Sequence, residues 1–189
     1  MSASVNPLST PHSTSQTQAD PDNRRWFALR VRTSREKLVS TAARHKGFDE
    51  FLPVYRSRRQ WSDRTKTMER PLFPGYLFCR LNPDDRLPLL SIPGVVNIVG
   101  IGRTPVPLDD AEIAAIRSTE QSGLQAEPCP FFTVGQRVRL EAGPLQGLEG
   151  LLVNCRNTRR FVVSVTLLMR SVAVEIESHW ARPLTDDFA

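Results

Sequence analysis

The apolar and polar positions of this chain divide it into four segments. Residues 1–23 have almost no apolar content, which predicts a disordered tail. Residues 24–117 alternate between the patterns of strands and of helices. Residues 118–131 lose this periodicity and gain Gly and Pro, so we expect a linker there. Residues 132–184 carry short strands at close spacing, the pattern of a small, strongly bent β-barrel.

Two of the predicted helices of the second segment begin at a capping box, in which the N-cap residue and a Glu three positions later bond each other's backbone. Thr33 and Glu36 have this spacing, and so do Asp109 and Glu112. Between the helices, the charged residues 56–70 alternate around a turn signal and predict a β-hairpin. The order of strands and helices predicts an α+β fold, an antiparallel sheet with flanking helices.

Glycine marks the turns of the last segment. Gly143, Gly147 and Gly150 suit a barrel corner, where the backbone takes a positive φ or two chains approach closely. No helix start or Walker-type Lys-Ser/Thr follows them, which argues against a phosphate-binding loop. Strands are predicted around them, at residues 136–140, 148–154, 161–168 and 171–177.

The positive charge is concentrated in one segment. The whole chain has a net charge of +5 and a pI near 9.6. Residues 24–117 hold 18 Lys/Arg and 10 Asp/Glu, a net charge of +8, whereas residues 118–189 hold 7 and 8, a net charge of −1. Such a field steers a protein toward nucleic acid or an acidic protein surface. A solvated basic face explains the charge equally well.

The inventory of reactive side chains argues against an enzyme. His45 and His179 have no Ser or Cys nucleophile with an acid partner in a motif context, and no carboxylate or histidine cluster has metal-binding spacing. We therefore expect no catalytic residue, no metal and no cofactor. Three cysteines without a CxxC pair fit a reducing cytoplasm. Since no apolar run approaches the roughly 20 residues that span a bilayer, we expect a cytoplasmic monomer without membrane contact.

Two motifs in fixed order carry a resemblance to a known family. The second half contains Val134-Gly135-Gln136-Arg137-Val138-Arg139-Leu140 and then Gly143-Pro144-Leu145-Gln146-Gly147-Leu148-Glu149-Gly150, which resemble the KOW motif of an SH3-like barrel. The first half resembles the NusG N-terminal (NGN) domain at Trp26-Phe27-Ala28-Leu29, Pro71-Leu72-Phe73-Pro74-Gly75-Tyr76-Leu77-Phe78 and Ile92-Pro93-Gly94-Val95. The match covers roughly residues 24–184. The chain is thus similar to NusG-family transcription elongation factors, and closest in character to specialised paralogues of the RfaH and UpxY type.

The resemblance implies that the NGN domain docks on the clamp helices of RNA polymerase through Arg30, Phe73, Pro74, Tyr76 and Phe78. Phe73 also lies beside a Pro-Gly break, a poor place for a sheet core, and exposed aromatic side chains often anchor interfaces. For Phe73 we therefore expect the interface, whereas for Phe78, in mid-strand, core and interface stay equally open. Arg30 departs from the aromatic residue of RfaH, and its guanidinium could stack on the clamp or pair with an acid there.

The resemblance also implies a surface for the non-template DNA strand, at Arg32, Arg35, Lys37 and Arg44. For Lys37 and Arg44 a solvated helix face is an equally good explanation. The predicted hairpin adds Arg58, Arg59 and Trp61, where an aromatic among basic residues could stack on a splayed base or cover a sheet edge. Phosphate contacts of this kind weaken with salt and do not read sequence.

One segment of the family's KOW domains binds a ribosomal protein of the small subunit, or the termination factor Rho. The corresponding residues are Leu167, Leu168, Met169 and Arg170. A turn that exposes Leu-Leu-Met is otherwise an unusual surface, although Leu167 fits a barrel core better. The resemblance thus implies a second partner for the last segment.

The sequence leads to the hypothesis of a bacterial transcription elongation or antitermination factor. Its first domain would hold RNA polymerase, associating the protein with the nucleoid, and suppress pausing or termination, while the linked barrel recruits a partner at high effective concentration. A housekeeping NusG is the alternative within the class. The alternative from another class is an RNA-binding, ribosome-associated KOW protein, against which the charge of −1 argues. A helical second domain, as in RfaH, is not expected because Val162-Val163-Ser164-Val165 favours strands.

Overall fold

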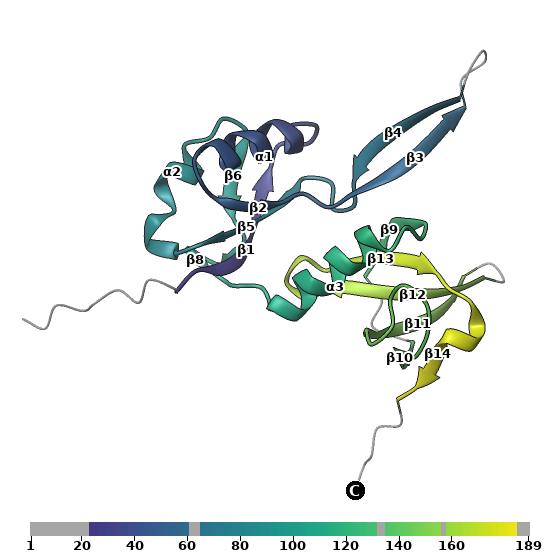
Figure 1. Ribbon diagram of the computed structural model, residues 1–189. Helices are drawn as coiled ribbons and strands as arrows, with labels where there is room; N and C mark the ends of the chain where they lie inside the picture. Colours follow the sequence, from purple (N-terminus) through teal and green to yellow (C-terminus); the bar gives the residue numbers. More distant parts are fainter. Residues whose placement is uncertain (1–22, 61–64, 132–134, 156–157, 185–189) are drawn as a thin grey trace, which may run out of the picture.

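The computed structural model describes residues 23–60, 65–131, 135–155 and 158–184. It contains two sheet-based parts with a helix between them, and a hairpin that extends away from both (Figure 1). Mixed helix and antiparallel sheet confirm the predicted α+β class. No helix in the described residues is long and apolar enough to cross a membrane.

The first part is a four-stranded sheet in the order β2-β5-β1-β6, and every pairing in it is antiparallel. Its strands are β1 (Arg25–Val31), β2 (Asp49–Phe51), β5 (Tyr76–Leu81) and β6 (Val95–Ile98). One face is covered by α1 (Glu36–His45) and α2 (Leu87–Leu90), which follows the short 3₁₀ helix η1 (Pro83–Asp85) (Figure 1). The core on this face includes Phe27, Leu29 and Leu77 of the sheet with Val39 and Ala43 of α1.

The other face of this sheet is also apolar, because successive side chains of a strand point to opposite faces. Trp26 and Ala28 of β1 and Phe78 of β5 lie there, all of them buried. They pack in one cluster with α3 (Asp110–Gln121) and with residues of the second part. A single apolar core therefore runs from the first sheet through α3 to the second sheet.

Two β-hairpins are attached to the first part. β3 (Val54–Gln60) pairs with β4 (Thr65–Pro71), and β7 (Gly100–Ile101) pairs with β8 (Thr104–Pro105). The β3–β4 hairpin contains the charged stretch that was predicted to form one, and it projects from the body of the molecule (Figure 1). It shares no sheet with other strands among the described residues.

The second part is a six-stranded antiparallel sheet in the order β14-β10-β11-β12-β13-β9. Its strands are β9 (Ala126–Pro130), β10 (Gln136–Leu140), β11 (Glu149–Cys155), β12 (Thr158–Val165), β13 (Arg170–Glu175) and β14 (Ala181–Pro183). The 3₁₀ helices η2 (Thr166–Leu168) and η3 (Ser178–Trp180) connect the last strands. The four predicted strands correspond to β10, β11, β12 and β13. Since β14 and β9 are the ends of this order, closure into a barrel stays a prediction.

The stretch expected to be a linker differs from the prediction. α3 continues to Gln121, and β9 occupies Ala126–Pro130 and pairs with β13. Residues 132–134 lie outside the described part of the chain. Prolines and a glycine had suggested an unstructured stretch, but β9 is an edge strand, where missing backbone donors are tolerated. Only residues 122–125 separate the helix from the second sheet.

Candidate functional site

The five residues predicted to contact the polymerase clamp lie close together on the first sheet. Arg30 pairs with Tyr76 in the β1–β5 ladder, and Ala28 pairs with Phe78 two positions further. Directly opposite residues share a face, so Arg30, Tyr76 and Phe78 point to the side of the sheet that faces α3. The Phe73 ring meets the Phe78 ring edge to face, with centroids 5.5 Å apart. Together with exposed Pro74 they form what we call the β5 patch: Arg30, Phe73, Pro74, Tyr76 and Phe78.

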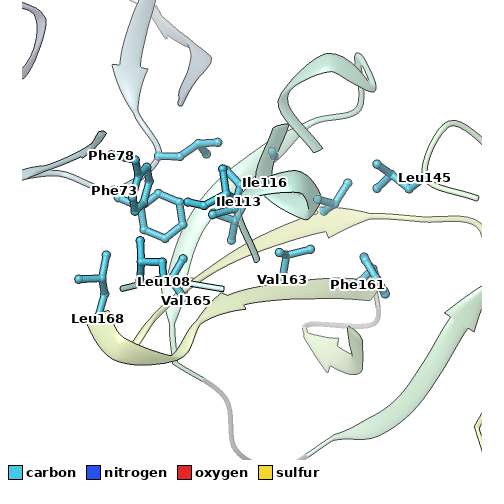
Figure 2. Close-up of a cluster of buried hydrophobic side chains, with 14 of the residues drawn as sticks. Phe73, Phe78, Leu108, Ile113, Ile116, Leu145, Phe161, Val163, Val165 and Leu168 are labelled. Carbon is cyan, nitrogen blue, oxygen red and sulfur yellow. The ribbon is translucent and has the colours of Figure 1, made fainter. Parts of the chain in front are cut away.

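The aromatic centre of the β5 patch is covered in this structure. Phe73 is 2% exposed and Phe78 is fully buried, so the expectation that Phe73 lies at the surface is wrong for this arrangement. Figure 2 shows both rings facing Ile113 and Ile116 of α3 and, on the other side, Leu168 of the second part. The Pro-Gly break does expose Pro74, but its neighbour turns inward because α3 and the second sheet supply an apolar cover that sequence spacing does not reveal.

Helix α3 connects the two parts by polar contacts as well. The Glu112 carboxylate accepts a hydrogen bond of 3.0 Å from the backbone N–H of Thr166 in η2. The Glu120 carboxylate accepts one of 2.8 Å from the N–H of Val54, where the β3–β4 hairpin begins. The Arg117 guanidinium lies 4.9 Å from the ring centroids of both Trp26 and Phe51, within the range of a cation–π contact. The helix thus fixes the hairpin, the first sheet and the second part relative to one another.

The loop that carries Phe73 and Pro74 is held by the buried carboxylate of Glu36. Its Oε1 accepts a hydrogen bond of 2.9 Å from the backbone N–H of Gly75, whose φ of +82° suits glycine. The Gly75 carbonyl in turn accepts a bond of 2.8 Å from the N–H of Val31. The predicted capping box at Thr33 is therefore wrong: Arg35 is the N-cap, and no side chain caps the helix.

The second predicted capping box is half right. The side chain of Asp109 accepts a hydrogen bond of 2.9 Å from the N–H of Ala111 and caps α3. Glu112 instead bonds Thr166, as described above. In both helices the glutamate was predicted to bond its own helix start, and in both it holds a distant segment of the chain.

The basic residues predicted to approach DNA fall into two groups. Arg32 and Arg35 are exposed and, among the described residues, make no ion pair. Lys37 pairs with Glu69 of the hairpin at 3.1 Å, and Arg44 pairs with Glu50 of β2. For Lys37 and Arg44 the alternative to DNA contact was a solvated helix face, and both residues are engaged in these ion pairs. Of the hairpin residues, Trp61 lies outside the described residues, as do the side chains of Arg58 and Arg59.

The segment predicted to bind a second partner follows β12. Leu168 is 7% exposed and belongs to the cluster that covers Phe73 and Phe78, and Leu167 packs against it. Met169 is 59% exposed, and Arg170 at the start of β13 is exposed too. The two apolar surfaces predicted for two different partners therefore cover each other.

The glycines of the second part occupy tight positions. A Cβ on Gly150 would lie 2.7 Å from the Val162 carbonyl oxygen and equally near the Phe161 ring. Gly143 has a φ of +80°, and a Cβ there would lie 2.6 Å from the Trp180 ring. Gly147 also has a positive φ, of +89°, but a Cβ there would have no atom within 4 Å. At Gly143 and Gly150 a side chain has no room without movement of Trp180 or of strand β12.

The described residues offer no group of three or more His, Cys, Asp or Glu side chains that could hold a metal ion. Cys79, in the core below α1, is fully buried, and burial raises the pKa of its thiol far above the ordinary value, with Glu50 and Asp49 adding to the effect. A thiol in this state is a packing group rather than a nucleophile.

Comparison with known proteins decides the family. Residues 24–117 match the model of the NusG family, described as transcription termination factor nusG. The chain is 25% identical to the transcription termination/antitermination protein NusG of Borreliella burgdorferi over 82% of its own length and 96% of that protein. It is 26% identical to the NusG of Escherichia coli K12 over 84% of its length and 96% of that protein. This chain belongs to the NusG family.

The fold of this NusG-family chain also agrees with a solved structure. The structure that describes the domain interaction in Thermotoga maritima NusG matches with a TM-score of 0.54 at 19% identity, over 85% of this chain and 97% of that one. At this identity the likeness concerns the fold alone. Family membership makes the chain a transcription termination/antitermination factor and not an enzyme.

Two kinds of residue in this NusG-family chain were missed from sequence. Glu112, Arg117 and Glu120 on α3 join the parts, but they look like an ordinary charged helix face. Glu36 was assigned to the wrong partner. For α3, Ile113 and Ile116 mark a buried face in the sequence, but they do not indicate that this face packs in one cluster with residues of both sheets.

The role of Glu36 can be tested by stability. We expect Glu36→Ala to lower the free energy of unfolding by about 1–3 kcal/mol, because the half-buried Gly75 N–H loses its acceptor. Glu36→Gln keeps an oxygen at the same place and should lose less. Urea unfolding of both variants checks this, with Glu69→Ala, which removes an exposed ion pair, as the control that changes little. An Ala variant as stable as the control would contradict the assigned role.

Proposed function

We propose that this NusG-family factor binds RNA polymerase through the β5 patch and offers its second domain, residues 132–184, to another partner. The observation that supports this most is the gathering of Arg30, Tyr76 and Phe78 on one sheet face, with Phe73 against them. They are the residues that the family resemblance implicates. A few residues supply most of the binding energy of a protein interface, and aromatic residues and arginine are enriched among them.

The proposal requires the two domains to separate. Phe73 and Phe78 are buried under α3 and the second domain, so a clamp helix cannot reach them in the closed arrangement. Opening uncovers the β5 patch and also Leu167 and Leu168, the segment proposed for the second partner. Binding of polymerase would then make the second domain available at the same moment, because both surfaces leave the same cluster. Polymerase binds the open state only and therefore shifts the population toward it.

We further propose that the second domain closes into an SH3-like KOW barrel, and that the factor suppresses pausing or termination while it is bound. The tight glycines at 143 and 150 support the strongly bent sheet that a barrel needs. The exposed Arg32 and Arg35 lie next to the β5 patch in sequence and are free to approach the phosphates of a non-template DNA strand. The second partner is proposed to be a small-subunit ribosomal protein or Rho.

The experiment is retention of purified bacterial RNA polymerase on the immobilised full chain. We expect Arg30→Glu to reduce the retained polymerase about tenfold or more, because it reverses the charge at the exposed rim of the β5 patch without touching the core. Arg103→Glu makes the same change at an exposed position of the β7–β8 turn and should leave retention unchanged. If neither the wild type nor the control retains polymerase, the proposal is wrong, and RNA and ribosomes become the partners to test.

A further inference from the structure

A groove of about 440 Å³ lies where the two domains meet. Three arginines line it, Arg30 and Arg32 from the first domain and Arg170 from the second. Arg30 had been predicted to contact the polymerase clamp, Arg32 to contact DNA, and Arg170 to contact the second partner. The other lining residues include Thr33, Pro74, Tyr76 and Val96. The volume is within the usual range of small-molecule sites.

The charge of this groove is uncompensated. No acidic residue lines it, and within the part of the chain that the structure describes none of the three arginines makes an ion pair or a side-chain hydrogen bond. Two other exposed arginines of the second domain are paired, Arg139 with Glu149 and Arg182 with Glu141, whereas exposed Arg159, outside the groove, makes no ion pair among the described residues. Like charges gathered at one place repel each other unless an anion joins them. The charge of the groove therefore suits a ligand with several negative charges.

The composition of the walls narrows the class of that ligand. Guanidinium groups bind phosphate oxygens with two parallel hydrogen bonds, and three of them suit closely spaced phosphates. The half-buried Tyr76 ring, with Pro74 and Val96, adds an apolar wall of the kind on which a nucleobase stacks. We propose that the groove is a binding site for a soluble nucleotide whose phosphates bridge the two domains.

Such a ligand would hold the domains closed. Arg170 reaches the groove only while Leu168, two residues before it, stays in the cluster with Phe73 and Phe78. A ligand that needs all three arginines binds the closed arrangement and not the open one, so it stabilises closure by mass action. It would compete with any partner that needs the β5 patch uncovered. The site rests on the domain arrangement and not on polymerase binding, so it is tested without polymerase.

The first measurement is calorimetric binding of inorganic tripolyphosphate, ATP and an oligothymidylate to the full chain at low salt. We expect Arg170→Gln to weaken binding about tenfold, because one of the three guanidinium groups no longer binds phosphate. Arg159→Gln removes an exposed arginine of the same domain outside the groove and should bind as the wild type does. Binding of tripolyphosphate and ATP supports the nucleotide site. Binding of the oligothymidylate alone overturns it, because the groove then only extends the surface already proposed for a DNA strand.

The second measurement is hydrogen exchange at the Thr166 amide, which bonds Glu112 across the domain contact. At a ligand concentration ten times the Kd, exchange through domain opening should slow about tenfold. The site is overturned if no probe binds, if Arg170→Gln binds as tightly as Arg159→Gln, or if ligand leaves the Thr166 amide unchanged. It is also overturned if a polyglutamate peptide binds as well as tripolyphosphate, because phosphate is then not the recognised group.

Discussion

We expect Phe78→Ala to lower the free energy of unfolding by about 3–5 kcal/mol, because it opens a cavity in the core that both domains share. Phe78 is fully buried in the middle of β5. Its ring centroid lies 5.5 Å from that of Phe73 and 6.1 Å from that of Phe51, so the truncation removes two aromatic contacts as well as apolar burial. Urea unfolding followed by far-UV circular dichroism measures the loss.

The control for this prediction is Leu38→Ala. Leu38 lies on α1 and is 51% exposed, so its truncation should change stability by no more than about 0.5 kcal/mol. Since the cluster reaches Leu168, Phe78→Ala should also speed exchange of the Thr166 amide in the second domain. A loss of less than about 1 kcal/mol, or an unchanged Thr166 amide, would show that Phe78 does not carry the shared core.

Local patterns in the sequence predicted the elements of each domain well. The β3–β4 hairpin needed only alternation around a turn, and β12 needed only its β-branched run. Asp109 caps α3 as predicted because its partner, the N–H of Ala111, is two residues away in the chain. Interactions of this range depend on the local sequence alone, and the sequence contains all that they need.

The arrangement of the domains could not be predicted in this way. Glu36 and Glu112 have the spacing of a capping box, but each bonds a backbone N–H far away in the chain, at Gly75 and at Thr166, which only the tertiary fold brings near. β9 is recognisable only through its partner β13. Phe73 was assigned to the surface since no cover for it was visible in the sequence. The residues of the candidate site were thus predicted from the sequence, but the closed arrangement that buries Phe73 was not.

The second large effect concerns that closed state. We expect Leu168→Glu to strengthen binding of RNA polymerase by the full chain. A carboxylate among Phe73, Phe78 and Val165 has no partner, and its burial would cost several kcal/mol, so the domains separate instead. If the open state is about a tenth or less of the wild-type population, the apparent affinity should rise about tenfold or more. Titration of labelled polymerase measures the affinity, and faster exchange of the Thr166 amide verifies opening.

Met169→Glu is the matched control, since it adds the same charge one residue further on, at a side chain that is 59% exposed. It should leave both affinity and exchange as in the wild type. Leu168 also belongs to the segment proposed for the second partner. Since polymerase is the only partner in this titration, damage to that segment does not affect the measured affinity. Should Leu168→Glu open the domains without tightening polymerase binding, the second domain would not be what covers the binding surface. The β5 patch would then have to act through Arg30, Pro74 and Tyr76, the members that remain accessible when Phe73 and Phe78 are buried.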